Sequence, residues 1–235
     1  EGCDQGYQSI ANKIDVDYVD NRATFCRTGF TLFGLGSALH TYSGNVVQGD
    51  GVTAGTRGFW WTTASVFGDA DLNAVARGNS LTMCEDGVVL FEDAASVGYV
   101  LGADLDGTGD PNLFAGNASY AIELVGCDDD IDADGNYYGS LDPVVVEGWI
   151  HHQVDDAGLG LVSFGGLAPV MTYCRSLEHS GGCTPGIDWS GAPSATLAQP
   201  FVLSAQEVRN QVPGMLIYGF TQAYAPFGGG ILCIK

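Results

Sequence analysis

The stretch that decides the expected fold runs from Asp104 to Asp142. It reads DLDGTGDPNL at residues 104–113 and CDDDIDADGNYYG at residues 127–139, on either side of a short apolar segment. No Lys or Arg occurs between Arg77 and Arg175, so most of the net charge of −20 falls in this part of the chain. Two aspartate-rich loops that flank a strand indicate an acidic, calcium-binding β protein.

The first acidic loop places oxygen-bearing side chains at alternate positions, with glycines between them that permit a tight turn around one ion. Its predicted calcium ligands are Asp104, Asp106, Thr108, Asp110 and Asn112. Residues 104–112 resemble a single calcium loop of FG-GAP-type β-propeller repeats, but one copy does not imply a propeller. Thr108 replaces the usual acidic third ligand, which would weaken binding. The alternative is an acidic glycine turn without an ion.

The second acidic loop has the DxDxDG pattern that begins many calcium loops. Its predicted ligands are Asp130, Asp132, Asp134 and Asn136. An EF-hand would need Glu where this chain has Leu141, so the loop is not an EF-hand. The two loops could share one site. We therefore expect Ca²⁺ as a structural cofactor that rigidifies the fold.

The charge balance excludes some partners. The chain of 235 residues has 28 acidic and 8 basic residues, and nucleic-acid binding needs clustered Lys and Arg. Anionic membranes are disfavoured for the same reason, and no apolar run is long enough for a transmembrane helix. Self-association, other surface proteins, glycans and cations remain as partners.

The cysteine pattern indicates an oxidising compartment. The seven cysteines are dispersed and none has CxxC spacing, which fits disulfides better than a zinc ribbon. The chain begins at Glu1 without Met, as expected of a mature secreted protein. We expect an extracellular or cell-surface location, with one cysteine left over.

Glycine, present at 35 positions, punctuates short apolar runs, which favours strands joined by turns. The one short helix expected is 71–77. The expected strands are 24–32, 38–47, 58–66, 87–91, 96–101, 119–125, 144–151, 159–164, 169–174, 201–205, 215–220 and 231–234. We predict an all-β fold, an antiparallel, jelly-roll-like β-sandwich with long acidic loops. Residues 1–168 would form this domain. Residues 169–235 would form a small disulfide-bonded β module, either separate or packed into the same domain.

The carboxyl-terminal quarter carries a recognisable pattern: YC at 173–174, GCTP at 182–185, SGAPSA at 190–195, GMLIYG at 214–219 and PFGGGILC at 226–233. Residues 172–235 resemble the C-terminal module of large secreted proteins from planctomycete-type and myxobacterial genomes. The resemblance implies secretion and a β-rich, disulfide-bonded closing module. Thr172 stands where that family usually has a cysteine, which removes one disulfide partner.

Two disulfides are plausible within this framework. Cys174 and Cys183 could close a small loop, and Cys84 could pair with Cys127. Cys233 would then be the odd thiol or would reach Cys3. Connectivity cannot be deduced from sequence alone.

Chemistry-bearing motifs are otherwise sparse. There is no HExxH, GxSxG, GxGxxG or P-loop, so no catalytic residue is assigned and an enzyme is the less favoured interpretation. Trp60, Trp61, Tyr137 and Tyr138 are candidate sugar-stacking residues, although core packing is the commoner fate of strand aromatics. Asn117 begins a glycosylation sequon.

The leading hypothesis is a secreted or cell-surface structural protein, a calcium-stabilised β subunit that assembles into a filament, layer or adhesive structure. The alternatives are a calcium-dependent glycan-binding module and a secreted polysaccharide hydrolase or lyase. Edge strands would mediate assembly.

Overall fold

The computed structural model divides into two compact units, Glu1–Met171 and Thr172–Lys235. It describes residues 3–9, 14–34, 36, 38–63, 70–92, 98–168, 182, 186–190, 200–206, 222–227 and 230–234. No helix among these residues is long and apolar enough to cross a membrane.

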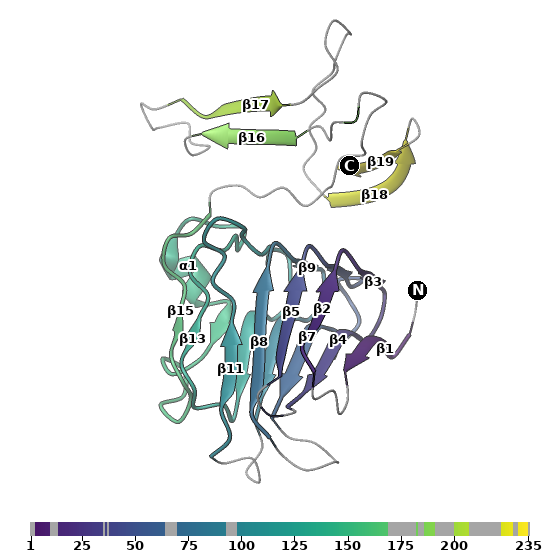
Figure 1. The fold of residues 1–235 in the computed structure, drawn as a ribbon. Coiled ribbons are helices and arrows are strands. Elements are labelled where there is room, and N and C mark those ends of the chain that lie inside the picture. The colour runs from purple at the N-terminus through teal and green to yellow at the C-terminus, as the bar shows by residue number, and fades with distance from the viewer. Residues whose placement is uncertain are drawn as a thin grey trace, which may run out of the picture. The chain divides into compact units, whose positions relative to one another are not determined.

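The first unit consists of three parallel sheets (Figure 1). Sheet A contains β1 (Gln5–Ser9), β4 (Thr28–Phe33), β7 (Arg57–Thr62), β10 (Asp86–Phe91), β12 (Tyr120–Val125) and β14 (Ile150–His151). Sheet B contains β2 (Val16–Val19), β5 (Leu39–Ser43), β8 (Leu72–Arg77), β11 (Leu101–Asp104), β13 (Ile131–Asp132) and β15 (Val162–Ser163). Sheet C contains β3 (Arg22–Thr24), β6 (Val46–Gln48) and β9 (Ser80–Thr82).

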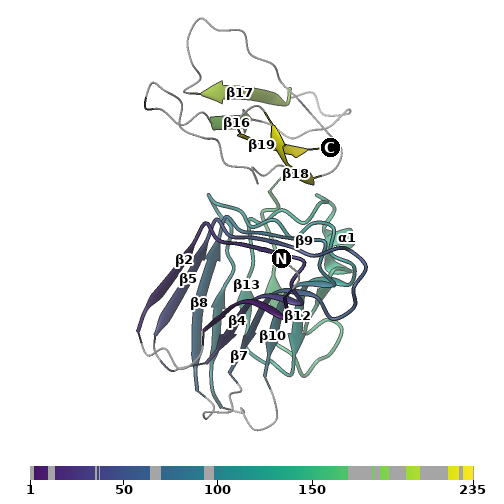
Figure 2. The same cartoon turned by 90° about the vertical axis from the view of Figure 1, so that its right-hand side faces the viewer.

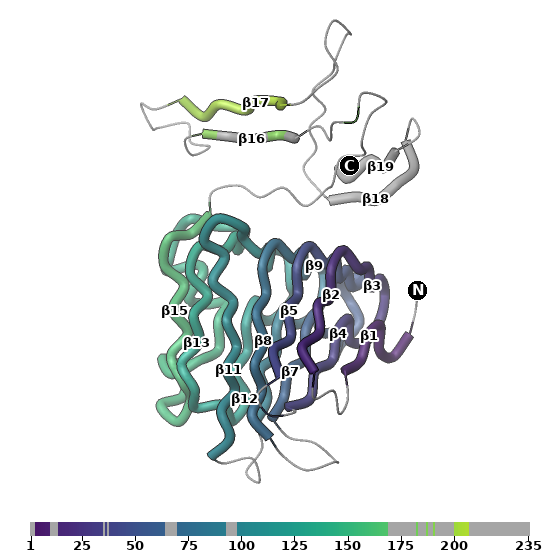
Figure 3. The backbone as a smooth tube through the Cα atoms, viewed as in Figure 1, coloured from purple at the N-terminus to yellow at the C-terminus, as the bar shows by residue number. Residues whose placement is uncertain are grey.

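The chain passes through the sheets in repeated coils, each of which contributes one strand to sheet A and then one to sheet B (Figure 3). In sheet A every strand pairs in parallel with its counterpart in the next coil, and sheets B and C behave in the same way. Figure 2 shows strands of sheets A and B on opposite sides of the unit. This arrangement is a parallel β-helix, so the predicted antiparallel β-sandwich is wrong although the all-β class holds.

Asparagines mark the turn that leads out of sheet B in five successive coils. They are Asn21, Asn45, Asn79, Asn112 and Asn136. Each of the first four donates a side-chain hydrogen bond to the next asparagine's Oδ1, at 2.9–3.0 Å. Such a ladder satisfies buried polar groups while it ties each coil to the next. We call these five residues the asparagine ladder.

The residue before a ladder asparagine usually has a left-handed backbone. The φ angles are 57° at Asp20, 62° at Gly44, 63° at Gly78 and 70° at Gly135. Glycine reaches this region without steric cost, and Asp tolerates it better than most residues. The Gly-Asn or Asp-Asn pair therefore turns the chain sharply and presents the asparagine to its neighbours.

The core lies between the sheets. In sheet A the inward residues of neighbouring strands are in register, so Phe30 lies beside Phe59, and Leu32 lies beside Trp61. All four are at most 1 % exposed. The rings of Phe59 and Trp61 stack with centroids 5.2 Å apart. Tyr42 of sheet B closes this aromatic core at 5.1 Å from Trp61.

Some expected elements differ from the observed ones. The helix predicted at 71–77 is strand β8, in which Leu72, Ala74 and Ala76 are buried alternately. Its helix-forming Leu and Ala residues are overruled by pairing with β5 and β11.

The strand predicted at 144–151 is instead helix α1 (Pro143–Glu147) followed by β14. Asp142 caps this helix by accepting a hydrogen bond from the Val144 amide, and Pro143 suits the first turn. Strand β11 also begins only at Leu101, where the expected strand ended.

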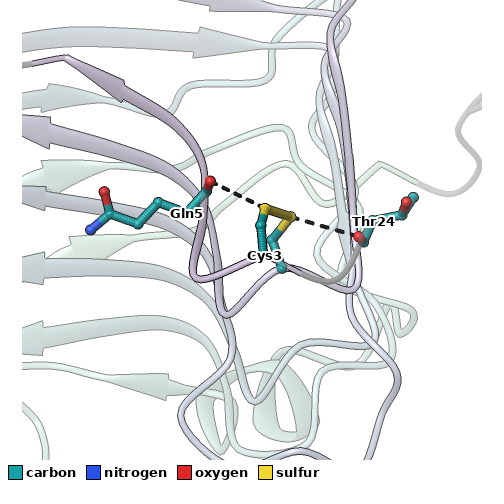
Figure 4. The surroundings of a disulfide bond; sticks show 4 residues. Cys3, Gln5 and Thr24 are labelled. Atoms are coloured by element: carbon teal, nitrogen blue, oxygen red, sulfur yellow. Dashed lines mark hydrogen bonds between the residues drawn. A yellow bond between two sulfur atoms is a disulfide. The ribbon is translucent and has the colours of Figure 1, made fainter.

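A disulfide closes the first coil. Cys3, just before β1, bridges to Cys26, just after β3, with their Cα atoms 4.5 Å apart (Figure 4). Closing a loop of this length stabilises the fold by roughly 3 kcal/mol. Cys3 is therefore not the partner of Cys233. Cys84 and Cys127 are free and buried, so the pair expected between them is not formed.

The second unit contains two antiparallel pairs of strands. One pair is β16 (Gly186–Ser190) with β17 (Val202–Gln206), and the other is β18 (Gln222–Phe227) with β19 (Gly230–Ile234). Cys174 and Cys183 lie outside the described residues, as do the strands expected at 169–174 and 215–220.

Candidate functional site

The outer face of sheet A carries three half-buried aromatic side chains, Phe33, Trp60 and Phe91, which we call the aromatic row. They come from β4, β7 and β10, one from each of three consecutive coils. Their alternating neighbours Leu32, Trp61 and Leu90 point into the core, because successive strand residues face opposite sides.

The row is continuous. The ring centroid of Trp60 lies 6.2 Å from that of Phe33 and 6.4 Å from that of Phe91, and both pairs meet edge to face. The Arg57 guanidinium carbon lies 5.5 Å from the Trp60 ring centroid. The Nε of Arg57 is buried without a hydrogen-bond partner. These groups form an aromatic surface with a cation at its side, a combination suited to stacking against a flat ligand.

Titratable groups continue this face toward the last coil. Trp60, Val89, Glu123 and His151 are register neighbours across β7, β10, β12 and β14. Burial raises the pKa of the Glu123 carboxyl, although His151 and Arg57 oppose the shift. The His151 ring packs 5.5 Å from that of Tyr120, and its Nδ1 lies 3.1 Å from the Leu124 carbonyl.

Asp86, at the start of β10, is only 6 % exposed. Burial, with a smaller contribution from the charge of Glu123, raises its pKa to about 6. The Tyr120 amide donates a 3.3 Å hydrogen bond to its Oδ1 and opposes the shift. Asp86 is thus a buried carboxylate in register with Arg57 of the neighbouring strand, held at a cost in stability near neutral pH.

This cost predicts a pH dependence. The folded-state pKa of Asp86 lies above its ordinary value, so the native state binds more protons between about pH 4 and pH 6. The free energy of unfolding should therefore fall as pH rises through this range, by on the order of 2 kcal/mol from Asp86. Asp86→Asn keeps an acceptor for Tyr120 and removes the charge. We expect it to be more stable than the wild type at pH 8 by about 1–2 kcal/mol.

Urea unfolding between pH 4 and pH 8 measures this difference. The remaining charged groups around Asp86 are Glu85, Glu123 and Arg57, and all are retained in the variant. Asp17→Asn, on an exposed position of β2, serves as the control and should follow the wild-type curve. A pH profile of Asp86→Asn parallel to that of the wild type would contradict the assignment.

The predicted calcium residues lie on the outer side of sheet B and in the turns that follow it. Asp104 of β11 is in register with Asp132 of β13, so two carboxylates come from directly neighbouring residues. The backbones of adjacent strands in a sheet are about 4.8 Å apart. The hydrogen bonding between these two coils continues beyond the strands, where the Gly107 amide donates to the Asp134 carbonyl at 2.7 Å. Asp104 also forms a 2.6 Å ion pair with Arg77.

The aspartates of the two loops mostly accept backbone hydrogen bonds, from the same loop or from the next coil. Asp106 accepts from the Thr108 amide, Asp130 from Leu161 and Asp134 from Gly165. Thr108 and Asp110 are exposed. Among the described residues, these carboxylates do not form a group of three ligand atoms around one point. Of these described carboxylates, only Asp104 and Asp132 are register neighbours on adjacent strands.

Asn112 and Asn136, the remaining predicted ligands, belong to the asparagine ladder and are fully buried. Each Oδ1 already accepts two hydrogen bonds from the preceding ladder residue, one from its main-chain nitrogen and one from its side-chain nitrogen. These oxygens are thus occupied by the fold.

The four predicted sugar-stacking residues divide between surface and core. Trp61 and Tyr138 are buried to 0 % and 1 % exposure, whereas Trp60 and Tyr137 are half-buried on outward positions. The Asn117 side-chain nitrogen donates to the carbonyls of Leu81 and Phe114. Its amide is therefore engaged in the turn after Phe114.

Sequence reasoning missed one cluster. Ligand atoms of Glu92, Cys127 and Asp129 all lie within 4.8 Å of one another. Glu92 follows β10, while Cys127 and Asp129 follow β12. Burial raises the pKa of Glu92 to about 7, with Asp129 and Asp128 adding to the shift, and burial also raises that of the Cys127 thiol to about 12. An acid directly after one strand and a cysteine directly after the next was the available signal.

The fold and these surfaces define the first unit as a parallel β-helix with an aromatic outer face on one sheet and a pair of neighbouring aspartates on another. No family model, no curated protein and no solved structure matches the chain.

Proposed function

We propose that this chain is a secreted, glycan-binding β-helix that holds an extended neutral polysaccharide along the outer face of sheet A. The observation that carries the proposal is the aromatic row, in which Phe33, Trp60 and Phe91 are contiguous and half-buried. Aromatic rings offer a flat apolar surface at little conformational cost, and sugar rings have apolar faces that can stack on them. A solenoid repeats such a residue from coil to coil, which matches a polymer.

Charge supports a neutral ligand. The net charge of −20 opposes binding of an acidic polymer at long range. Arg57, Glu123 and His151 lie beside the row and supply hydrogen-bonding groups of both signs for sugar hydroxyls. The aromatic row would supply contact area, and these polar groups would supply orientation.

Trp60→Ala tests the proposal. We expect it to weaken binding of a responsive polysaccharide at least tenfold, because Trp60 is the centre of the row and such residues dominate interface energies. The measurement is affinity electrophoresis and tryptophan quenching over a panel of soluble β-glucans, mannans and xylans. Tyr99→Ala is the control, since Tyr99 is a solvent-exposed aromatic, at 40 %, that lies outside the row. Equal binding by the two variants, or no binding across the panel, would overturn the proposal.

A second candidate is a calcium-stabilised structural subunit that assembles through its terminal coils. It is favoured by the open edges of β1 and β2, the first strands in sheets A and B, and by the like-charged neighbours Asp104 and Asp132. Calcium between these carboxylates would offset their repulsion. Light scattering of the native protein, first in calcium and then in chelator, distinguishes this candidate from the glycan-binding module. Particles that dissociate in chelator favour assembly. A molar mass that stays at that of a monomer favours the glycan-binding module.

A polysaccharide hydrolase or lyase is the third candidate. Asp86 and Glu123 are carboxylates with raised pKa values, and glycosidases work with pairs of carboxylates. The appearance of new reducing ends or unsaturated products during the panel assay would identify this activity.

A further inference from the structure

We propose that Glu92, Cys127 and Asp129 form a binding site for a zinc-like divalent cation at the corner of the β-helix where the chain leaves sheet A. The site is separate from the predicted calcium residues and from the aromatic row. Its test therefore does not depend on the outcome of the glycan experiment.

Local backbone geometry brings the three ligands together. Glu92 follows β10 immediately, and its amide donates to the Val125 carbonyl at the end of β12, which aligns the two coils. Gly126 then adopts a left-handed φ of 68° directly above Glu92, where a Cβ would collide with the Glu92 carbonyl. This turn brings Cys127 to the same corner as Glu92, two residues before Asp129.

The distances suit a small cation. All three ligand atoms lie within 4.8 Å of one another. In a tetrahedral zinc site, bonds of about 2.0–2.3 Å put ligand atoms roughly 3.3–3.7 Å apart. Small side-chain rotations are sufficient to close the difference. Three protein ligands leave a fourth position for water.

The donor set selects the kind of metal. A cysteine sulfur is a poor ligand for Ca²⁺ and Mg²⁺, whereas thiolate with carboxylate oxygens suits Zn²⁺ and chemically similar ions such as Co²⁺. Cys127 is fully buried and forms no disulfide, and its sulfur donates only a weak 4.0 Å hydrogen bond to the Asp129 carbonyl, which a metal bond would replace. No other group of three such ligand atoms occurs within the described part of the chain.

Electrostatics favour a bound cation. Glu92 is 5 % exposed, lies beside Asp129 and Asp128, and sits in the part of the sequence that lacks Lys and Arg. Burying a carboxylate next to other carboxylates is costly unless a positive charge compensates it. A divalent cation supplies that charge where no basic side chain is available.

Neighbouring groups orient the ligands. The Thr63 hydroxyl donates to Glu92 Oε1 at 3.4 Å, and the Leu101 amide donates to Asp129 Oδ2 at 2.6 Å. The Asp128 amide also donates toward the Glu92 carboxylate. Outer hydrogen bonds of this kind hold ligands in position and are a regular part of metal sites.

The test begins with the full chain, from which bound metal has been removed with a chelator. The protein is then titrated with Co²⁺ and afterwards with Zn²⁺. We expect a thiolate-to-cobalt charge-transfer band in the wild type that Zn²⁺ displaces. Zinc at a hundredfold excess over its dissociation constant should also raise Tm by roughly 5–10 °C. Cys127→Ala should lose the band and most of the thermal shift.

Cys84→Ala is the matched control, because Cys84 is the other free and fully buried thiol of the first unit and should leave both signals unchanged. Asp129→Asn is a second variant. The Asp129 side chain is half-buried, and asparagine keeps an acceptor for the Leu101 amide, so the protein should still fold. We expect this substitution to weaken zinc binding at least tenfold. A band that survives Cys127→Ala, or that Cys84→Ala reduces equally, would overturn the proposal, as would unchanged affinity in a folded Asp129→Asn protein.

Discussion

Asn79→Ala is expected to lower the free energy of unfolding by about 3–5 kcal/mol, the largest effect that we anticipate for a single side chain. Asn79 is the central residue of the asparagine ladder and is fully buried. Its Oδ1 accepts from the main-chain and side-chain nitrogens of Asn45 at 2.9 and 3.0 Å. Its Nδ2 donates to the Tyr42 carbonyl and to Asn112 Oδ1, both at 2.9 Å.

The cost arises because alanine leaves these partners without water or a substitute. Each buried group that loses its only hydrogen bond costs about 1–3 kcal/mol, and the lost side-chain volume adds to this. Urea unfolding followed by tryptophan fluorescence measures the change. Asn21→Ala is the matched control, since Asn21 is the half-buried first residue of the ladder and donates to Asn45 alone through its side chain. We expect it to cost about 1 kcal/mol. If the two variants lose equal stability, the ladder does not act as a buried network.

The ladder also explains why the fold class was predicted only in part. Strands at 87–91 and 119–125 coincide closely with β10 and β12, because β-branched and apolar runs bounded by glycine predict strands well. Alternation of apolar residues does not distinguish parallel from antiparallel pairing. The informative signal was the asparagine that follows Asp20, Gly44, Gly78 and Gly135. The five ladder asparagines, of which Asn112 follows Pro111 instead, are spaced by 24, 34, 33 and 24 residues, and this irregular spacing hid the repeat.

The candidate site was predictable to a smaller extent. Trp60 and Trp61 are adjacent and must face opposite sides of a strand, but the sequence does not say which of them faces outward. Phe33 and Phe91 join Trp60 only through the register of β4, β7 and β10, which depends on pairing between residues far apart in the chain. The cluster of Glu92 and Cys127 depends on the same register and was missed for the same reason.

For the predicted calcium ligands, a pattern local in the sequence was visible, but it did not determine where the side chains lie in the fold. A local pattern predicted that Asp104 to Asn112 would surround one ion, as alternate residues of a tight loop do. In the structure Asp104 ends strand β11 and Asn112 lies in the buried ladder, so the segment is divided between a sheet and a turn. Pairing with the next coil, through Asp104 and Asp132, controls where these side chains point. Calcium binding by the aspartates stays a prediction.

Gly58→Ala is expected to destabilise the β-helix by about 3 kcal/mol. Glycines at positions 6, 29, 58 and 87 stack from coil to coil near the start of the first four strands of sheet A. A Cβ at Gly58 would collide with the Gly87 carbonyl and would lie 3.0 Å from Leu81 Cβ. Backbone atoms cannot move aside without separating β7 from β10, so the strain cannot relax locally.

The predicted consequence extends to function, because Trp60 lies two residues beyond Gly58. A shift of β7 relative to β10 changes the spacing between Trp60 and Phe91 in the aromatic row. We therefore expect Gly58→Ala to weaken glycan binding as well as to lower the urea midpoint. Gly148→Ala is the control: Gly148 has a φ of −67° and its nearest contact, the Val145 carbonyl, is 3.6 Å from a built Cβ. That variant should change stability by less than about 0.5 kcal/mol. A Gly58→Ala protein as stable as Gly148→Ala would show that the coils can separate at this corner without cost, and the close stacking of glycines would then have no role in positioning the aromatic row.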